Sequence, residues 1–378
     1  MSAKENNGIK FLIAVALVAF GSALPLHADQ VDEVIREQMK KRGISGLSLA
    51  IIDGGKIVRE QGCGFTDKSG KTPVTNSTLF QAGSISKAVA ALGALHLVDK
   101  GLLSLDEDVN AKLRTWTMPQ NKFTDARKVT LRLILSHSAG ITVHGFPGYP
   151  VGAPLPTMAQ ILDGEKPANT AAIRVDRTPG SEWKYSGGGY VVMQQMVIDV
   201  TRKPFPKFME ETVLKPLGMV SSTYSQPLPD EMAVRAAKGY GGLFGQPIHG
   251  AWHVYPEMAA AGLWTTAGDL GRFVIGIQNA IAGKSNPVIS QPLTQEMLTI
   301  QRNNDGLGLF LKSSGKTLRF LHDGVDAGFD ATMRAYAYAG KGAVVMINKN
   351  DDGKAVSQIL SVIGEQYHWP DYGDRKEK

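Results

Sequence analysis

Hydrophobic positions at the start of the chain repeat first with the spacing of a helix and then with that of strands. Apolar residues recur every three or four positions over 31–39, and Gly43 follows as a stop signal, which predicts an amphipathic helix. The run 47–52 is almost continuously apolar, and the following Asp53-Gly54-Gly55 is typical of a hairpin turn. Residues 56–60 fit the returning strand. The pattern therefore predicts a helix followed by a β-hairpin.

The segment 84–97 is apolar on nearly every side of a helix. Alanine, valine and leucine fill almost all positions from 88 to 95, and Gly101 follows the segment. A helix without a polar face is normally buried. We therefore expect this segment to lie in the interior and Gly101 to end it.

Proline and glycine break the middle of the chain into short helical pieces. Four prolines fall within 142–156, which predicts a surface loop that can form the wall of a pocket. Strand-like apolar runs return at 318–321, 331–338 and 342–348, and a closing helix is expected from about 355 to 367.

Strands at both ends of the chain, around a helical middle, predict an α+β fold. We expect one antiparallel sheet built from both chain ends and flanked by helices, with a mostly helical lobe inserted between them. Residues 29–378 then form one domain, with a sheet lobe at about 29–80 and 300–370 and a helical lobe at about 84–290. A cleft between the lobes is the expected place for a site.

Composition excludes several classes of protein. The 378 residues are 43% hydrophobic and 20% charged, which argues against disordered, collagen-like and coiled-coil chains. The single cysteine, Cys63, excludes an internal disulfide and a cysteine-built metal site. The net charge of +6 is spread along the chain, so no nucleic-acid partner is expected. The histidines show no paired metal-ligand spacing, and we expect neither a metal nor a cofactor.

Residues 1–28 have the features of a secretory signal peptide. Lys4 and Lys10 precede the apolar run 11–20, and Ala28 offers a small residue for cleavage before Asp29. The apolar run is shorter than the roughly 20 residues that a membrane-spanning helix needs. An uncleaved anchor is the alternative. We expect cleavage, export to the periplasm or medium, and no stable membrane span afterwards.

Ser84 and Lys87 are the strongest candidates for chemistry in the chain. They are three residues apart at the start of the apolar helix, so one helical turn places them on the same face. A serine hydroxyl becomes a nucleophile when a neighbouring base takes its proton, and a lysine can act as that base where burial favours its neutral form. Free N–H groups at a helix start can also stabilise an oxyanion. The alternative is that Ser84 only caps the helix.

Further sequence blocks surround these two residues and follow them along the chain. They are Phe80-Gln81-Ala82-Gly83, Leu97 to Asp106, Leu135-Ser136-His137-Ser138-Ala139-Gly140-Ile141, Pro179-Gly180, Tyr185-Ser186-Gly187-Gly188-Gly189-Tyr190, Leu214-Lys215-Pro216-Leu217-Gly218-Met219, Gly262 to Leu270, and His322-Asp323-Gly324. Together with Ser84-Ile85-Ser86-Lys87 they resemble the β-lactamase-related serine hydrolases. That family includes class C β-lactamases, DD-carboxypeptidases, D-aminopeptidases and family VIII carboxylesterases. The blocks occur in the family's order and cover nearly all of residues 30–365.

The resemblance implies a catalytic role for Tyr185, which would relay protons between Ser84 and the leaving group. In the family an asparagine usually follows two residues after this tyrosine, and Gly187 stands in its place. A glycine cannot contact the substrate's acylamino carbonyl, so binding of peptides or β-lactam side chains is placed in doubt. We interpret Gly187-Gly188-Gly189 as a tight turn with room for a ligand near the backbone. His137 is expected to shape the core near the site.

His322-Asp323-Gly324 fits the family's His-x-Gly strand, which lines the cleft. The resemblance implies that His322 assists substrate placement, that Gly324 lets a substrate lie against the strand, and that the N–H of Val325 pairs with that of Ser84 as an oxyanion hole. Asp323 would repel a substrate carboxylate where the family often has a hydroxyl. We therefore expect neutral or amine-bearing acyl substrates to be preferred over those with a free carboxylate.

The sequence thus predicts an exported serine hydrolase that acts without a cofactor on a small-molecule acyl substrate. Its covalent acyl-enzyme would form from an ester, amide or β-lactam carbonyl. One alternative is a penicillin-binding sensor or scaffold that does not turn over. Another is a DD-carboxypeptidase or D-aminopeptidase acting on D-amino-acid peptides. The sequence leaves open whether Lys87 or Tyr185 is the base.

Overall fold

A computed structural model describes residues 1, 29–242 and 245–372 of the chain. Residues 2–28 of the predicted signal peptide, 1–28, lie outside the described residues. No helix in the described part of the chain is both long and apolar enough to cross a membrane.

One six-stranded antiparallel sheet is built from the two ends of the chain, as predicted. Its strand order is β2-β1-β12-β11-β10-β9. The strands are β1 (Gly46–Asp53), β2 (Lys56–Gly64), β9 (Phe310–Lys312), β10 (Arg319–Asp326), β11 (Phe329–Tyr336) and β12 (Gly342–Ile347). In register, Leu49 of β1 is opposite Val345 of β12, which joins the first hairpin to the last. The α+β fold class is therefore confirmed.

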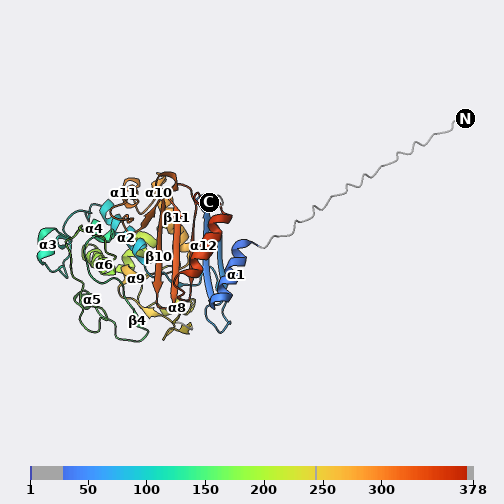
Figure 1. Cartoon of the computed structure of the whole chain (residues 1–378), viewed down its shortest axis with the longest axis horizontal. Coiled ribbons are helices and arrows are strands. Elements are labelled where there is room, and N and C mark those ends of the chain that lie inside the picture. Colours follow the sequence, from blue (N-terminus) through green and yellow to red (C-terminus); the bar gives the residue numbers. More distant parts are fainter. Residues whose placement is uncertain (2–28, 243–244, 373–378) are drawn as a thin grey trace, which may run out of the picture.

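Helices from the two chain ends cover one face of this sheet. They are α1 (Gln30–Arg42) and α12 (Lys354–Gln366), which lie side by side in Figure 1. Leu47, Leu49 and Ile51 of β1 point into this layer, because alternate residues of a strand face opposite sides. Gly43 ends α1 in a left-handed conformation with φ 61°, which confirms the predicted stop.

The helical lobe packs on the other side of the molecule (Figure 1). Its helices are α2 (Ile85–Asp99), α3 (Lys122–Ala126), α4 (Leu131–Leu135), α5 (Met158–Asp163), α6 (Gly187–Thr201), α7 (Phe205–Met209), α8 (Asp230–Ala233), α9 (Met258–Ala261) and α11 (Gln291–Met297). Short strand pairs connect its parts: β3 (Phe80–Gln81) with β8 (Trp264–Thr265), β4 (Tyr149–Pro150) with β7 (His253–Val254), and β5 (Tyr240–Gly241) with β6 (Gln246–Pro247).

The helix α10 (Ala267–Ile281) packs on the sheet, although its residues fall within the segment expected to form the helical lobe. It covers β1 and β12 on the face opposite α1. A side chain at Gly271 would lie 3.1 Å from Ile57 and 3.5 Å from Ala50, so the glycine permits this close packing. The sequence pattern shows that α10 is apolar on one face but not which layer covers that face.

Strand β10 runs five residues past Leu321, where the predicted apolar run ends, and so includes His322-Asp323-Gly324, which the family resemblance placed on a strand. Its inward positions beyond that point are His322, Gly324 and Asp326, which are buried, while Asp323 and Val325 are exposed. Polar residues thus occupy the buried positions of an ordinary strand alternation. A hydrophobic pattern cannot detect such a strand.

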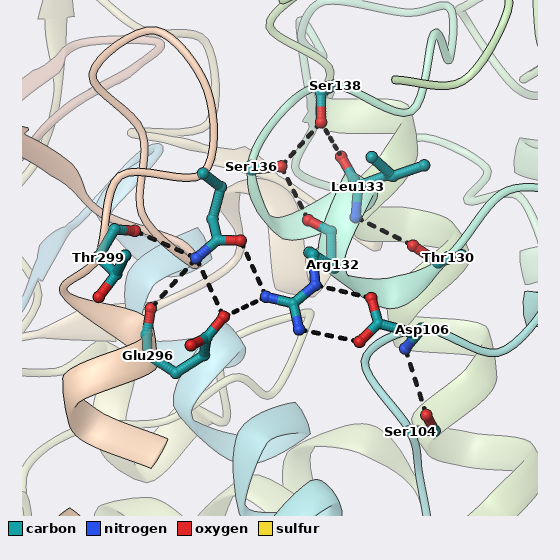
Figure 2. A network of polar contacts seen from close by, with 10 residues as sticks. Ser104, Asp106, Thr130, Arg132, Leu133, Ser136, Ser138, Glu296 and Thr299 are labelled. Carbon is teal, nitrogen blue, oxygen red and sulfur yellow. Dashed lines mark hydrogen bonds and ion pairs between the residues drawn. The ribbon is translucent and has the colours of Figure 1, made fainter. Parts of the chain in front are cut away.

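A polar network ties α4 to α11 and to the loop that follows α2 (Figure 2). Arg132 of α4 donates two hydrogen bonds to the carboxylate of Asp106, at 2.7 and 2.8 Å. It also binds Glu296 and donates to the side-chain oxygen of Gln301 at 2.8 Å. Ser136 donates from Oγ to the carbonyl of Arg132 at 2.8 Å. The network therefore anchors the segment that leads from α4 into the site.

Candidate active site

Ser84 stands immediately before α2, and its hydroxyl is not used to cap that helix. Its backbone has right-handed helical angles, and its side chain makes no capping hydrogen bond. Ser86 has the structural role instead, because its Oγ donates to the carbonyl of Gly83 at 2.6 Å and accepts from the N–H of Leu263 at 3.0 Å. The interpretation of Ser84 as a simple cap is therefore wrong.

Lys87 turns inward and meets Ser84. Its side chain is only 2% exposed, as expected for a residue of an all-apolar helix. The Lys87 Nζ lies 3.0 Å from the Ser84 Oγ and donates to the carbonyl of Ala260, at the end of α9, at 2.7 Å. The structure thus brings together the amine and the hydroxyl that the sequence spacing placed on one face.

Tyr185 reaches the same place from the loop that precedes α6. The Lys87 Nζ lies 5.1 Å from the centre of the Tyr185 ring. The ring of His137 packs on one side of the tyrosine, with centroids 4.2 Å apart, and His144 approaches it edge-on at 4.8 Å. Phe310 of β9 is nearly parallel to the tyrosine ring at 6.4 Å. These aromatic contacts fix the position of the phenol ring beside the amine.

His137 is buried beside the site, as the sequence predicted, and it also supports the tyrosine loop. Its Nδ1 accepts from the N–H of Ser186 at 3.1 Å. Burial, together with the neighbouring Lys87, holds the pKa of His137 well below its usual value. The imidazole is therefore neutral and carries its hydrogen on Nε2. Ser186 in turn caps α6 by accepting from the N–H of Gly189 at 3.0 Å.

His322 lies on β10 at the inner edge of the site and is 2% exposed. Its Nδ1 is 2.7 Å from the carbonyl oxygen of Asp323. A carbonyl only accepts hydrogen bonds, so Nδ1 carries the hydrogen and Nε2 of the neutral ring keeps its lone pair. Burial, reinforced by Lys87, lowers the pKa of His322 to about 4. The ring is therefore uncharged at neutral pH.

The sequence interpretation expected Gly324 to let a substrate lie against the strand. The structure contradicts this expectation. A side chain at this position would lie 1.9 Å from the carbonyl oxygen of Ala82 and 3.1 Å from the backbone nitrogen of Ser84. Gly83, with φ 52°, is equally close to the strand, because its missing Cβ would lie 2.4 Å from the nitrogen of Val325. Both glycines allow β10 to press against the turn that carries Ser84. The backbone nitrogens of Ser84 and Val325 consequently lie on the same wall.

These groups open into a single cavity of about 550 Å³. The predicted residues Ser84, Lys87, Tyr185, His322 and Val325 all line it, whereas Gly324 lies behind the wall. Other lining residues come from the loop after α4, the end of α9, and strands β9 and β10: His144, Gly145, Phe146, Pro147, Ala260, Ala261, Phe310, Asp323 and Asp326. Within the described residues, no group of three or more His, Cys, Asp or Glu side chains could hold a metal ion.

The sequence interpretation missed two buried carboxyls, Asp326 on the cavity wall and Glu257 just before α9. Asp326 is 5% exposed and Glu257 is fully buried, and each has one side-chain oxygen without a hydrogen-bond partner among the described residues. Burial raises the pKa of Asp326 well above its usual value and that of Glu257 to about 7. The signal for Asp326 was its place two residues after Gly324, on the same face of the strand.

The three glycines after Tyr185 form the first turn of α6 and not a loop with space for a ligand. All three are buried. A side chain at Gly187 would lie 3.0 Å from the ring of Phe146 and 3.1 Å from the carbonyl oxygen of His144. The space that a side chain at 187 would take is therefore filled by the loop that follows α4. The sequence predicted this loop as a pocket wall, but not its contact with Gly187.

Comparison with known proteins finds relatives of this chain. Protein flp of Staphylococcus aureus (strain N315) is 26% identical over 202 residues, which are 52% of this chain and 38% of flp. The chain therefore aligns with well under half the length of that relative. The putative penicillin-binding protein PbpX of Bacillus subtilis (strain 168) is 25% identical over 346 residues, covering 89% of this chain and 79% of PbpX.

A solved structure of a β-lactamase/D-alanine carboxypeptidase from Pseudomonas syringae has the same fold. It superposes with a TM-score of 0.70 at 21% identity, covering 89% of this chain and 99% of the other. The sequence profile described as Beta-lactamase matches residues 31–365, which include the whole cavity. The chain therefore belongs to the Beta-lactamase family, whose members are generally serine hydrolases.

Proposed function

We propose that this protein is a serine hydrolase that works through a covalent acyl-enzyme on ester, amide or β-lactam carbonyls. The observation that carries the proposal is the 3.0 Å contact between the buried Lys87 amine and the Ser84 hydroxyl, which no helix cap competes for. A nucleophile and a base within hydrogen-bond distance are what acyl transfer requires.

In the first half-reaction, the Ser84 Oγ attacks the carbonyl carbon and its proton passes to the pair formed by Lys87 and Tyr185. The N–H groups of Ser84 and Val325 stabilise the oxyanion. The tetrahedral intermediate then collapses, the bond to the leaving group breaks, and Tyr185 returns the proton to that group. Water then attacks the carbonyl carbon of the acyl-enzyme. The proton transfers run in reverse, the Ser84 Oγ regains its proton, and the acid is released.

His322 would assist substrate placement as a neutral residue. Its low pKa means that it cannot hold a substrate carboxylate by charge at neutral pH. Asp323 is exposed at the cavity edge and accepts from the Thr332 hydroxyl at 2.5 Å. Both features support a preference for substrates without a free carboxylate at this end of the site.

The test is an activity panel on the full chain and on Ser84→Ala. The panel contains p-nitrophenyl esters, nitrocefin and a D-Ala-D-Ala peptide, and intact mass spectrometry follows the acyl-enzyme. We expect turnover and a mass increase in the wild type, and neither in Ser84→Ala. Equal activity of the two proteins would contradict the proposal.

A non-turnover penicillin-binding sensor is a second candidate, favoured by the absence of a side chain at Gly187. In the family an asparagine amide at this position contacts the acylamino group. A stoichiometric burst with nitrocefin, followed by a stable adduct and no turnover of any ester, would support the sensor over the hydrolase.

We also propose that the protein is exported. The apolar run 11–20 after Lys4 and Lys10 supports a signal peptide. N-terminal sequencing of the protein from a fractionated host would show a mature chain that starts at Asp29 and lies outside the cytoplasm. A full-length chain in the cytoplasmic fraction would overturn this proposal.

A further inference from the structure

The loop that follows α4 is fixed at both ends over the catalytic cavity. At its start, the carbonyls of Val143 and His144 each accept a hydrogen bond at 3.0 Å, from the N–H groups of Gly188 and Gly187 respectively. At its end, the carbonyl of Pro147 lies 2.8 Å from the Nδ1 of His253, and β4 then pairs with β7. The residues between these points, 144–147, all line the cavity. We call them the cavity loop.

Backbone strain marks the point where the cavity loop begins. Val143 has φ 64°, a left-handed conformation that β-branched residues avoid. Such a conformation persists only where surrounding contacts determine it, and it is common at functional sites. Here the contact is the hydrogen bond from Gly188. The strained residue turns the chain so that His144 and Phe146 reach the cavity beside Tyr185.

The glycines of α6 make this arrangement possible. A Cβ at Gly188 would lie 2.4 Å from the carbonyl oxygen of Thr142, and one at Gly187 would lie 3.0 Å from the Phe146 ring. A longer side chain at 187 would therefore meet the phenyl ring and the loop backbone. Phe146 is half-buried against the main core, so it is a fixed part of the wall.

The wall that results is largely apolar. Phe146 and Pro147 face the cavity from this loop, and Phe310, Ala261 and Val325 line it from other elements. Contact with such a surface stabilises hydrocarbon groups removed from water. A polar acylamino group bound here would contact the Phe146 ring, because Gly187 supplies no side-chain amide.

We propose that Gly187 and Phe146 act together as the specificity determinant of the site, selecting substrates whose acyl group is an uncharged hydrocarbon chain. This inference rests on the proposed function and names its substrate class. The phenyl ring contacts the acyl chain beyond the reacting carbonyl, and Gly187 is the residue that admits the ring.

The first experiment compares p-nitrophenyl acetate, butyrate and hexanoate as substrates of the wild type and Phe146→Ala. We expect kcat/KM of the wild type to rise with chain length. Phe146→Ala should lose about tenfold in kcat/KM for butyrate, the usual effect of lost apolar pocket contacts, and much less for acetate. Phe65→Ala is the matched control, because Phe65 is 41% exposed and lies outside the cavity.

The second experiment tests the coupling of the two positions. Gly187→Asn should lower butyrate activity because its side chain displaces Phe146, and the double variant Gly187→Asn/Phe146→Ala should be less impaired than the sum of the single effects. Gly187→Ala, which adds only a Cβ, serves if Gly187→Asn does not fold. Additive effects, or an equal loss for acetate and butyrate in Phe146→Ala, would overturn the inference.

A binding measurement separates failure of this inference from failure of the proposed function. In a Ser84→Ala background, calorimetry with p-nitrophenyl acetate and butyrate measures affinity without acylation. Tighter binding of butyrate that disappears with Phe146→Ala supports the apolar wall, even if the wild type hydrolyses neither ester. Equal affinity for the two esters, with and without Phe146, would refute it.

Discussion

Acid should destabilise this protein through His322, the neutral imidazole on β10. Burial and the neighbouring Lys87 lower the pKa of His322 from 6.5 to about 4. As pH falls through this window, the unfolded chain takes up a proton that the folded chain cannot accept. Stability is therefore highest above pH 6.5 and declines towards pH 4.

The size of this effect follows from the two pKa values. A fall from 6.5 to about 4 corresponds to about 3 kcal/mol when the whole window is crossed. Relative to pH 7, about 1 kcal/mol of the free energy of unfolding should be lost at pH 5.5, and about 2 kcal/mol at pH 4.5.

The assay is urea denaturation of the wild type and His322→Asn at pH 7, 5.5 and 4.5. Asparagine keeps an N–H donor near the Asp323 carbonyl but takes up no proton. The difference in free energy of unfolding between the two proteins should therefore change by about 2 kcal/mol over this range. The exposed His249→Asn is the matched control for loss of an imidazole. Parallel pH profiles for wild type and His322→Asn would refute the reasoning.

Three further perturbations test other parts of the structure. The raised pKa of Glu257 destabilises the folded protein increasingly as pH rises from 4.5 to about 7, by about 3 kcal/mol in full. Glu257→Gln should remove this loss. A difference in melting temperature between the variant and the wild type that does not change with pH would contradict this. Arg132→Met should cost about 1–2 kcal/mol in urea denaturation because it leaves a charged network unpaired. Lys207→Met, at an exposed pair, should leave the urea midpoint almost unchanged. Gly324→Ala should force β10 away from the carbonyl of Ala82 and lower kcat for ester hydrolysis about 100-fold, measured with circular dichroism as a folding control; unchanged kcat would exclude the close approach.

Local features of this chain could be predicted because local sequence determines them. The stop of α1 at Gly43 and the turn at Gly54 and Gly55, with φ 56° and 72°, depend on glycines that adopt left-handed conformations. The proximity of Ser84 and Lys87 follows from helical geometry alone. Each of these predictions involves residues less than one helical turn or one hairpin apart.

The features that the sequence could not predict depend on contacts between distant segments. Gly187 meets Phe146, which is 41 positions earlier in the chain, and periodicity carries no information about such a pair. Gly324 was expected to face a substrate, but its neighbour is the carbonyl of Ala82. Strand β9, only three residues long, is too short to give a period at all.

The candidate site depends on backbone contact between two segments that lie far apart in the sequence. Ser84 belongs to the segment that begins α2, whereas Val325 belongs to a strand near the end of the chain. Their N–H groups can act on one oxyanion only if β10 lies directly against the turn before α2. That contact leaves no room for a Cβ at Gly83 or Gly324. The proposed chemistry therefore depends on the missing side chains of two glycines as much as on the lysine and the tyrosine.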